Sequence, residues 1–542
     1  MTATRQLIHA VFCCALIATA TTFASGVERS KNMHAQTIER RVHLAPPIAN
    51  ESHYAYVAFN VPRRAVRVSI SYDYERAGGA NTIDIGVFDA RSTGSDTDPR
   101  GFRGWSGGRR SEFFISRNEA TPGYMAGELP TGTWRIILGL YKIAPTGVAV
   151  SFKIQVETED TRATMTALRR ADLSSVAPSI KASTLSVTAD GVSGTRPLSQ
   201  KVFGSNLRWW SGDLHMHTVH SDGDWTIPGL ISSARDEGLD FICITDHNTA
   251  SHHAEIDRIE IDRAKTDRTE TDRAHRGSRL PLVLRGEEIT TYGGHTNAWG
   301  LPSGAWIDFR VRAGDAARMS EVAAQAHRYG ALISVNHPFV LCGGCAWSYE
   351  AALKEFDAVE VWNGEWDATD EAALKMWDEA LRRGLRLTAV ASSDSHRPRN
   401  PIGHPTTHVA AGQLSQTALL AAIRRGRVYL TGEASGPFVS FEAEATTGRF
   451  RPRRTVGEEI RLNAPATLRF IINAQVARPG ATVSLVSNGT LLRSWPSRSD
   501  GQTEVFEVEC LRDSYYRLEV RDQTSSMLAL TNPIYIKVRA RR

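Results

Sequence analysis

Histidine and carboxylate side chains recur in short motifs through the middle of the 542-residue chain. His215 and His217 lie two residues apart at the end of a β-type run, so both imidazoles point to one face and can bind one ion. Asp394 and His396 repeat this spacing. Further motifs with such side chains are Ser221-Asp222-Gly223, Asp246-His247, Gly286-Glu287-Glu288, Gly294-His295 and Asn336-His337-Pro338. Together these motifs predict a centre for divalent metal ions.

Such a centre is suited to hydrolysis. Two cations a few ångströms apart lower the pKa of a shared water and supply hydroxide at neutral pH. They also neutralise the oxyanion that develops as the bond breaks. Phosphoesters fit this chemistry, and carboxylic esters or carbamates fit it equally well. A Gly-x-Ser-x-Gly elbow and a nucleophilic cysteine are not evident, so a covalent intermediate is not favoured.

The elements that must position these side chains lie in residues 206–432. β-type runs there alternate with helical ones, which predicts parallel strands with helices packed outside them. The β-type runs are 241–245, 282–284, 331–335, 358–361 and 387–391, and the helical runs are 227–237, 319–329, 370–383 and 416–425. Several of the motifs follow strand ends, and in barrels of parallel strands these ends build the active site. We therefore expect the motifs to converge in space.

At these motifs the sequence resembles the polymerase and histidinol phosphatase (PHP) superfamily, over about residues 210–400. The resemblance implies a distorted (β/α)7 barrel that holds two or three divalent metal ions per chain (Zn, Mn or Fe). A closer similarity, to a branch of exported metallohydrolases that includes carbaryl hydrolase, extends over most of the mature chain. It rests on residues 104–108, 120–124, 212–218 and 532–535.

The resemblance also implies a role for each motif residue. The first metal would be held by His215, His217, Glu288 and Asp394. Glu288 would bridge to a second metal, completed by His295 and His337, and a third would be held by Asp222, His247 and His396. Glu288, Asp394 and His337 are the expected catalytic residues. Many superfamily members have histidine where this chain has Asp222, and Glu287 is the rival of Glu288 for the bridge.

Other residues near the motifs are expected to contact substrate or to support the ligands. Arg397, Trp362 and Asn363 are predicted to contact substrate. Asp246 would orient a ligand. Three further histidines, at 220, 252 and 253, are expected at the surface or behind the ligands.

Regions of β character flank the barrel. Residues 25–158 predict an N-terminal β-sandwich, 159–205 a linker, and 433–542 a C-terminal β domain. The fold class is therefore multidomain, with a central barrel between two β domains. Residues 255–274 repeat a five-residue charged unit without an apolar stripe, which predicts a solvated insertion inside the barrel.

The first 24 residues have the pattern of a signal peptide. Arg5 precedes an apolar stretch that is shorter than a membrane-spanning helix. A secreted or periplasmic protein, with no transmembrane segment after signal removal, is predicted. In an oxidising compartment Cys342 and Cys345 predict a short structural disulfide, with two free thiols as the alternative. The net charge of +5 is small, and arginines are scattered, so no nucleic-acid surface is expected.

Three functions compete on this evidence. The leading hypothesis is an exported metal-dependent phosphoesterase of a small-molecule substrate. The second is a carboxylic ester or carbamate hydrolase on the same metal site, and the third is an envelope or carbohydrate-binding protein with a residual site. The complete set of ligands disfavours the third. The oligomeric state does not follow from the sequence.

Overall fold

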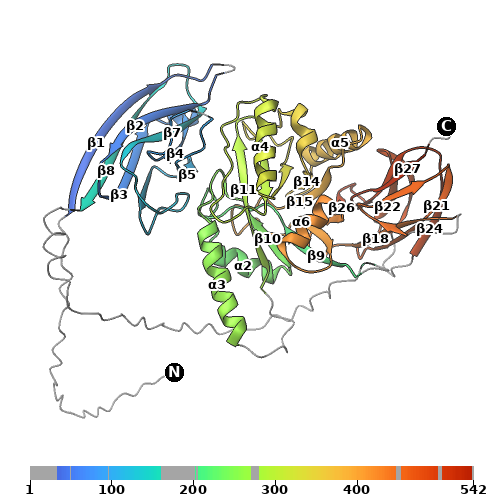
Figure 1. The fold of residues 1–542 in the computed structure, drawn as a ribbon. Helices are drawn as coiled ribbons and strands as arrows, with labels where there is room; N and C mark the ends of the chain where they lie inside the picture. Colours follow the sequence, from blue (N-terminus) through green and yellow to red (C-terminus); the bar gives the residue numbers. More distant parts are fainter. Residues whose placement is uncertain are drawn as a thin grey trace, which may run out of the picture.

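The structure is a computed structural model that describes residues 33–48, 51–95, 97–159, 202, 206–269, 280–446, 453–497 and 503–539. The predicted signal peptide (1–24) and most of the predicted linker (159–205) lie outside these ranges. Within them a β domain, a central body of strands and helices, and a second β domain follow one another along the molecule (Figure 1). The multidomain, mainly β architecture is therefore confirmed. No helix in the described ranges has the length and apolar character that a membrane crossing needs.

The N-terminal domain consists of two antiparallel sheets, with strand orders β1-β8-β3-β6 and β2-β7-β4-β5. Alternating side chains of these strands fill the space between the sheets, as in a sandwich. The strands are β1 (Met33–Leu44), β2 (Tyr54–Val61), β3 (Ala65–Tyr74), β4 (Thr82–Phe88), β5 (Phe102–Gly107), β6 (Glu112–Ser116), β7 (Gly132–Lys142) and β8 (Val148–Glu159). A short 3-10 helix, η1 (Ala77–Gly79), precedes β4.

The central body contains buried strands between amphipathic helices. The short parallel strands are buried throughout and mainly apolar, because helices or neighbouring strands cover both of their faces. The strands are β9 (Arg208–Asp213), β10 (Phe241–Ile244), β11 (Leu282–Thr291), β12 (Gly294–Trp299), β13 (Leu332–Val335), β14 (Ala358–Asn363), β15 (Thr388–Ser392), β16 (Thr406–Ala411) and β17 (Val428–Thr431). The helices are α2 (Ile227–Asp236), α3 (His253–Thr269), α4 (Ala316–Arg328), α5 (Ala368–Arg382), α6 (Gln416–Arg424) and the 3-10 helix η2 (Glu350–Glu355).

The strands of the central body lie in the order β15-β14-β13-β12-β11-β10-β9. Backbone hydrogen bonds then connect the two ends of this array: the His217 amide donates to the Ser395 carbonyl (3.0 Å), and the Asp394 amide donates to that of His215 (3.0 Å). β12 is antiparallel to both of its neighbours and follows β11 through a tight turn without a helix. The regular (β/α)7 alternation is therefore interrupted at this hairpin, and a barrel of that type stays a prediction.

Local sequence explains where several helices begin. The Thr226 and Asp315 side chains accept hydrogen bonds from backbone amides in the first turns of α2 and α4. Asp367 and Asp370 form a capping box at the start of α5. These caps fix the starting points of helices that pack on the strands carrying the predicted ligands.

Helix α3 contains the start of the charged repeat, and the start is not solvated as expected. Ile256 is buried in an apolar cluster with residues of α2. Asp257 pairs with Arg285 at 2.8 Å, and Glu255 pairs with His220 at 3.2 Å. The side chains of residues 263–279 lie outside the description. The first repeat therefore belongs to the packed body, because Ile256 and Ile259 are three residues apart and share a helix face.

The C-terminal domain continues the central sheet. β17 pairs antiparallel with β26, so hydrogen-bonded strands run from the central body into this domain. A second sheet has the order β19-β18-β21-β24. The strands are β18 (Phe438–Ala445), β19 (Arg454–Thr455), β20 (Glu459–Leu462), β21 (Ala466–Gln475), β22 (Thr482–Ser487), β23 (Thr490–Pro496), β24 (Thr503–Cys510), β25 (Ser514–Arg521), β26 (Met527–Thr531) and β27 (Ile534–Val538).

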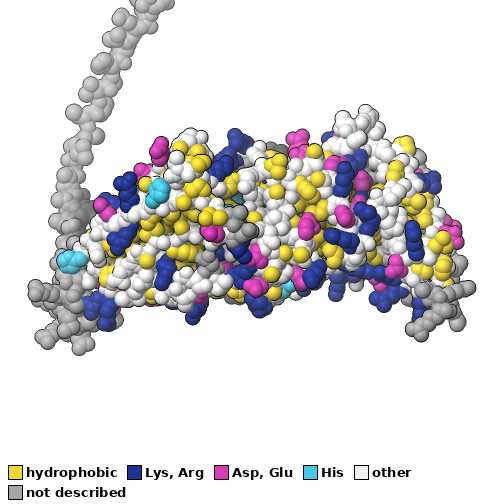
Figure 2. Space-filling model, turned by 90° about the horizontal axis from the view of Figure 1, so that it is seen from above, with side chains coloured by type: hydrophobic (Ala, Val, Ile, Leu, Met, Phe, Trp, Pro, Cys, Tyr) yellow, Lys and Arg dark blue, Asp and Glu magenta, His cyan; other side chains and the backbone are white. Residues whose placement is uncertain are grey.

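The surface carries no single basic stripe on the face drawn in Figure 2. Lys and Arg side chains are spread along the elongated molecule among Asp, Glu and apolar side chains. This distribution is in line with the small net charge of +5.

Candidate metal centre

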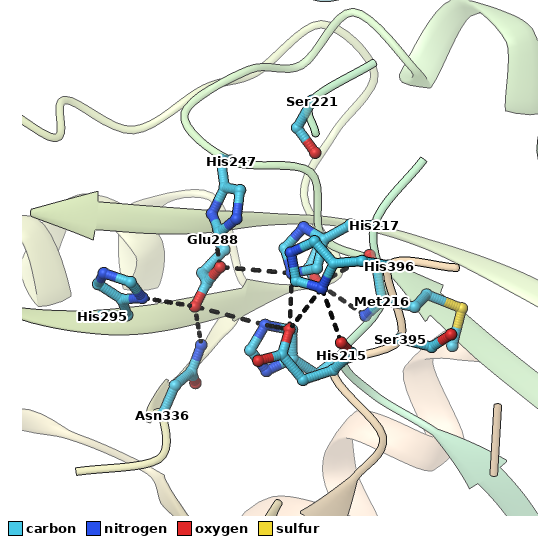
Figure 3. A network of polar contacts seen from close by, with 12 residues as sticks. His215, Met216, His217, Ser221, His247, Glu288, His295, Asn336, Ser395 and His396 are labelled. Atoms are coloured by element: carbon cyan, nitrogen blue, oxygen red, sulfur yellow. Dashed lines mark hydrogen bonds and ion pairs between the residues drawn. The ribbon is translucent and has the colours of Figure 1, made fainter. Parts of the chain in front are cut away.

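The structure brings the predicted ligands together at one end of the strand array. They come from segments that follow β9, β10, β13 and β15, and from β11 and β12 themselves. Figure 3 shows the carboxylate of Glu288 facing His247, His295 and Asn336, with the rings of His217 and His396 beside one another. The residues that meet here are His215, His217, Asp222, His247, Glu288, His295, His337, Asp394 and His396. Their role as metal ligands stays a prediction.

Glu288 lies at the middle of the group. Its Oε1 atom is 3.3 Å from His215 Nε2, 3.3 Å from His295 Nδ1 and 3.4 Å from His337 Nε2. Its Oε2 atom is 2.7 Å from His247 Nδ1. Each carboxylate oxygen therefore faces a different set of imidazoles, which is the arrangement that a bridging ligand requires.

Asp394 faces the His-x-His pair. Its Oδ1 atom is 3.3 Å from His215 Nε2 and 3.0 Å from His217 Nε2. The imidazoles reach the same oxygen because they lie two residues apart on extended chain after β9, as the sequence predicts. One oxygen and two nitrogens here form a compact donor set.

A third donor set lies around Asp222. Its Oδ1 atom is 3.4 Å from His247 Nε2 and 3.3 Å from His396 Nε2. A ligand nitrogen of His217 also lies within 4.8 Å of the other donor atoms in this set. His217 thus faces both the set around Asp394 and the set around Asp222, whereas the sequence assigned it to the first metal alone.

The geometry of the donor atoms fits metal ions. Ligand atoms bound at about 2.1 Å to one tetrahedral ion lie roughly 3.4 Å apart. Most of the separations around Glu288 and Asp394 are 3.0–3.5 Å. His215 Nε2, His217 Nε2 and Asp394 Oδ1 are buried, yet form no hydrogen bond of acceptable geometry among the described residues. Their lone pairs converge on common points, which is what a shared cation would use.

The carboxylates and imidazoles of the group shift one another's pKa values. Burial raises the pKa of Glu288, but the surrounding imidazoles more than offset this and hold the pKa well below its usual value. The same balance, with His215 as the main partner, lowers the pKa of Asp394. Burial and the neighbouring His247 and His396 lower the pKa of His217 to about 4. The carboxylates in turn offset burial and raise the pKa of His215, His247 and His337, and that of His396 to about 9, so a bound cation would take the place of protons on these imidazoles.

Glu287, the rival residue, points away from the group. Its Oε2 atom accepts a hydrogen bond of 2.7 Å from the Ile307 amide. Burial raises its pKa well above the usual value, which favours the neutral form. Glu287 and Glu288 are neighbours on β11, and successive strand residues face opposite sides. The structure therefore directs Glu288, and not Glu287, to the centre.

The backbone is strained at this centre. His337 and Asp394 have positive φ angles of 24° and 49°, and Asn248, next to His247, has 52°. Residues other than glycine adopt this region at a cost of order 1–3 kcal/mol, and such residues cluster at functional sites. The surrounding hydrogen bonds hold the two ligands in this conformation.

Sequence reasoning missed Glu360, which lies behind the ligands. Its Oε1 atom is 3.2 Å from His215 Nδ1, and its Oε2 atom accepts the His337 amide at 3.0 Å. A buried carboxylate on the far nitrogen fixes the orientation of a ligating imidazole. The available signal was an acidic residue inside the apolar run of β14. Asn336 was also missed, and its amide donates to Glu288 Oε1 at 3.0 Å.

Asp246 holds the loop that carries Asp222. It accepts hydrogen bonds from the Thr218 amide (2.7 Å), the Thr218 hydroxyl (2.7 Å) and the Ser221 hydroxyl (2.6 Å). His252 Nδ1 lies 3.3 Å from Asp246 Oδ2 and is buried, which fits the second of the two positions expected for it, behind the ligands. The expected orienting role of Asp246 is consistent with these contacts.

The predicted substrate residues lie in different surroundings. Trp362 is 3% exposed and packs on Trp366 and Gly432, and its contact with substrate stays a prediction. The Asn363 amide donates to Glu360 at 2.9 Å. Arg397 is about half exposed beside His396 and pairs with Asp224 at 3.3 Å. An aromatic residue at a strand end can belong to the core or line a pocket.

Comparisons with known proteins give partial likenesses. No family model matches the sequence, and no curated protein matches it. Among solved structures, the chain is similar to a two-domain protein from Bacteroides vulgatus that contains a predicted PHP-like metal-dependent phosphoesterase. The identity is 18%, the TM-score is 0.36, and the match covers 63% of this chain and 99% of that one.

Two further solved structures match a smaller part of the chain. A proposed metal-dependent phosphoesterase from Bifidobacterium adolescentis has 19% identity and a TM-score of 0.25, over 35% of this chain and 90% of that one. An amidohydrolase from Chromobacterium violaceum has 16% identity and a TM-score of 0.25, over 36% and 90%. Because all of these TM-scores are below 0.5, the function is inferred from the geometry of the centre itself.

Proposed function

We propose that the protein is a metal-dependent hydrolase of the PHP type, with phosphoesters as the leading substrate class. The observation that carries the proposal is the position of Glu288 among four imidazoles, with Asp394 and Asp222 completing adjacent donor sets. Divalent ions would be held by His215, His217, Glu288 and Asp394, by Glu288, His295 and His337, and by Asp222, His247 and His396. The closed (β/α)7 barrel belongs to the same proposal.

The residues of the chain have distinct tasks in this reaction. Bound divalent ions would supply an activated water and positive charge opposite the developing oxyanion. Glu288, Asp394 and His337 would keep these charges in place beside the reacting bond. Glu360 fixes the ring of His215, and Asn336 fixes one oxygen of Glu288. Asp246 holds the loop with Asp222 in position.

Charge at the rim favours an anionic substrate. Arg397 of the central body and Arg109 of the N-terminal domain both pair with Asp224, at 3.3 and 2.6 Å, two residues from Asp222. Both guanidinium groups are more than 40% exposed, so they keep donors for a phosphoryl group. We infer that Arg397 contacts substrate.

A carboxylic ester or carbamate hydrolase is the second candidate. It is favoured by the sequence similarity to the exported branch that includes carbaryl hydrolase. Residues 104–108 and 120–124, on which that similarity rests, lie where the N-terminal domain meets the central body: Trp105 packs on Phe309 at 4.7 Å, and Gly123 bonds to Ser251 at 3.1 Å. The domain limits 25–158, 206–432 and 433–542, and export after residue 24, are part of the proposal.

The test compares two neighbouring glutamates. Glu288→Gln keeps the shape and removes the charge that holds two cations together at close range. We expect it to lose metal and to lower turnover by roughly a hundredfold, on the order of 3 kcal/mol in the barrier. Glu287→Gln is the matched control and should keep both, because the Glu287 side chain accepts a hydrogen bond from the Ile307 amide, away from the centre, and burial favours its neutral form.

Metal content by mass spectrometry and hydrolysis of an aryl phosphate and an aryl ester would be measured side by side. The ratio of the two activities decides between the substrate classes. Full metal content and full activity in Glu288→Gln would refute the proposed centre.

A further inference from the structure

The Cys342–Cys345 disulfide closes a short loop beside the candidate centre. This confirms the predicted pairing. The loop follows His337 and is held at both ends: the Trp347 amide donates to the Pro338 carbonyl (2.9 Å), and the Gly294 amide donates to the Gly344 carbonyl (2.8 Å). Tyr141 of the N-terminal domain donates a hydrogen bond to the Cys342 carbonyl. The loop is therefore fixed against the turn that precedes His295.

The two sulfurs of the disulfide have different surroundings. Cys342 is exposed, whereas Cys345 is 5% exposed. Cys345 Sγ, one ring nitrogen of His295 and one of His337 all lie within 4.8 Å of one another. The buried Nδ1 atoms of these two histidines form no hydrogen bond among the described residues. A sulfur and one nitrogen from each of two imidazoles thus lie within ligand distance of one another.

This donor set has a clear chemical preference. Two imidazoles and one thiolate form a site for zinc or another borderline-soft ion, with a fourth position open. In the disulfide the sulfur is neutral and is a poor ligand, because the thiolate is the form that binds metals. The Cys345 sulfur lies beside His295 and His337. It can therefore bind a metal ion only after the disulfide is reduced.

We propose that Cys345 is a latent metal ligand, released by a dithiol reductant to complete a site with His295 and His337. One thiolate of the dithiol attacks the exposed Cys342 sulfur, and the S–S bond breaks with Cys345 thiolate as leaving group. The second dithiol sulfur then displaces Cys342 as a thiol and forms a cyclic disulfide. Two electrons pass from the dithiol to the protein, one proton stays on Cys342, and one goes to solvent when Cys345 binds the ion.

This inference rests on the proposed function, since His295 and His337 belong to the proposed second metal position. Its consequence is a change of donor set from imidazole and carboxylate to imidazole and thiolate. The sulfur would take a coordination position that water or substrate uses in the oxidised chain. Reduction would therefore change the donor atoms of this position and, with them, the metal ion that it prefers.

Cobalt substitution tests the inference by absorption and not by activity. The full chain is loaded with Co²⁺, whose ligand-field bands report binding and whose near-ultraviolet charge-transfer band reports a thiolate ligand. Cys342→Ser leaves Cys345 as a free thiol without any reductant. Cys345→Ser is the matched control, because it leaves Cys342, Cys243 and Cys510 as free thiols and removes the sulfur in question.

The expected result is a thiolate band in Cys342→Ser and in wild type reduced by a dithiol and then desalted, and its absence in oxidised wild type and Cys345→Ser. Ligand-field bands without a thiolate band in both Cys342→Ser and the reduced wild type would overturn the inference and leave the metal centre intact. No cobalt bands in any form would overturn the centre and the inference together. A thiolate band in the reduced forms, together with no hydrolysis of any ester by the oxidised, metal-loaded wild type, would uphold the inference and refute the hydrolase.

Discussion

The two β domains contact the central body in different ways. The N-terminal domain reaches the loops that carry predicted ligands: Arg109 pairs with Asp224, and Tyr292, three residues before His295, donates to Asp84 at 2.7 Å. The C-terminal domain instead continues the strand ladder through β17 and β26. It also contacts the outer helix α5, where Arg517 binds Asp378 with two hydrogen bonds of 3.1 and 2.5 Å.

This difference separates two kinds of support. Contacts to ligand-bearing loops act on the geometry of the centre, since a small displacement of a ligand changes metal binding. Contacts to a strand ladder and an outer helix act on the free energy of unfolding. They bury surface between the two domains and involve none of the motif residues. Substitutions at the N-terminal interface should therefore change turnover, and those at the C-terminal interface should change stability.

The largest expected effect on stability is at the C-terminal interface. Arg517 and Asp378 are 1% and 7% exposed, so Asp378→Ala leaves a buried guanidinium with Glu519 as its remaining carboxylate. We expect a loss of about 3 kcal/mol in the free energy of unfolding. Turnover per folded molecule should stay unchanged. Chemical denaturation and steady-state kinetics measure the two quantities.

The double variant Asp378→Leu with Arg517→Met is the control, because it removes both charges and keeps apolar volume. It should regain most of the lost stability. A single variant as stable as wild type would show that this ion pair does not hold the domains together.

A smaller effect is expected at the N-terminal interface. Gly123 has φ +99°, and a Cβ there would lie 2.8 Å from the Trp105 carbonyl oxygen and 3.0 Å from that of His220, two residues before Asp222. Gly123→Ala should cost about 1–2 kcal/mol from the left-handed backbone. By displacing the loop with Asp222 it should also lower turnover, by roughly tenfold. Kinetics and metal content are the measurements.

Gly127→Ala separates backbone strain from displacement. Gly127 has φ +139° in the same loop, but its Cβ would have only the Arg103 guanidinium within contact, at 3.8 Å. It should lose similar stability and keep full turnover. Equal turnover in both variants would contradict an influence of the N-terminal domain on the centre.

The smallest effect is expected outside both interfaces, in the charged repeat. Deletion of 265–274 removes two units without a large apolar side chain and should change stability by less than about 0.5 kcal/mol. Deletion of the equally long 255–264 removes Ile256 and should cost about 2 kcal/mol. Thermal unfolding of the two variants gives the comparison, and equal losses would show that α3 packs along its whole length.

The ligand motifs could be predicted because their signal is local. A His-x-His pair at a strand end fixes the direction of both rings within three residues, and the structure placed His215 and His217 accordingly. Glu360 could not be found in this way, because its partner His215 lies 145 residues away and only the fold makes the contact. The hairpin of β11 and β12 was also missed. Polar residues and glycine surround the ligands on both strands, so no apolar run marked two separate strands on either side of the turn at Tyr292-Gly293.

The packed start of α3 illustrates a different limit. Ile256 and Ile259 lie among charged residues, so the high average polarity of the repeat predicted a solvated segment. The structure instead places the two apolar side chains on one helix face. The type of Trp362 and its place at a strand end fit a binding residue, whereas its burial follows only from the fold. Motif spacing reports chemistry, whereas burial depends on what packs above a residue.

The ladder between β17 and β26 also decides how the molecule can be divided. A chain cut after Thr431 would present β17 as an edge strand with unpaired amide and carbonyl groups, a surface that promotes strand addition between molecules. Asn532 would be lost as well, and with it two hydrogen bonds to Ala389 on β15, of 2.8 and 2.9 Å. We therefore expect the central body and the C-terminal domain to unfold and refold as one cooperative unit, although the sequence predicts two domains.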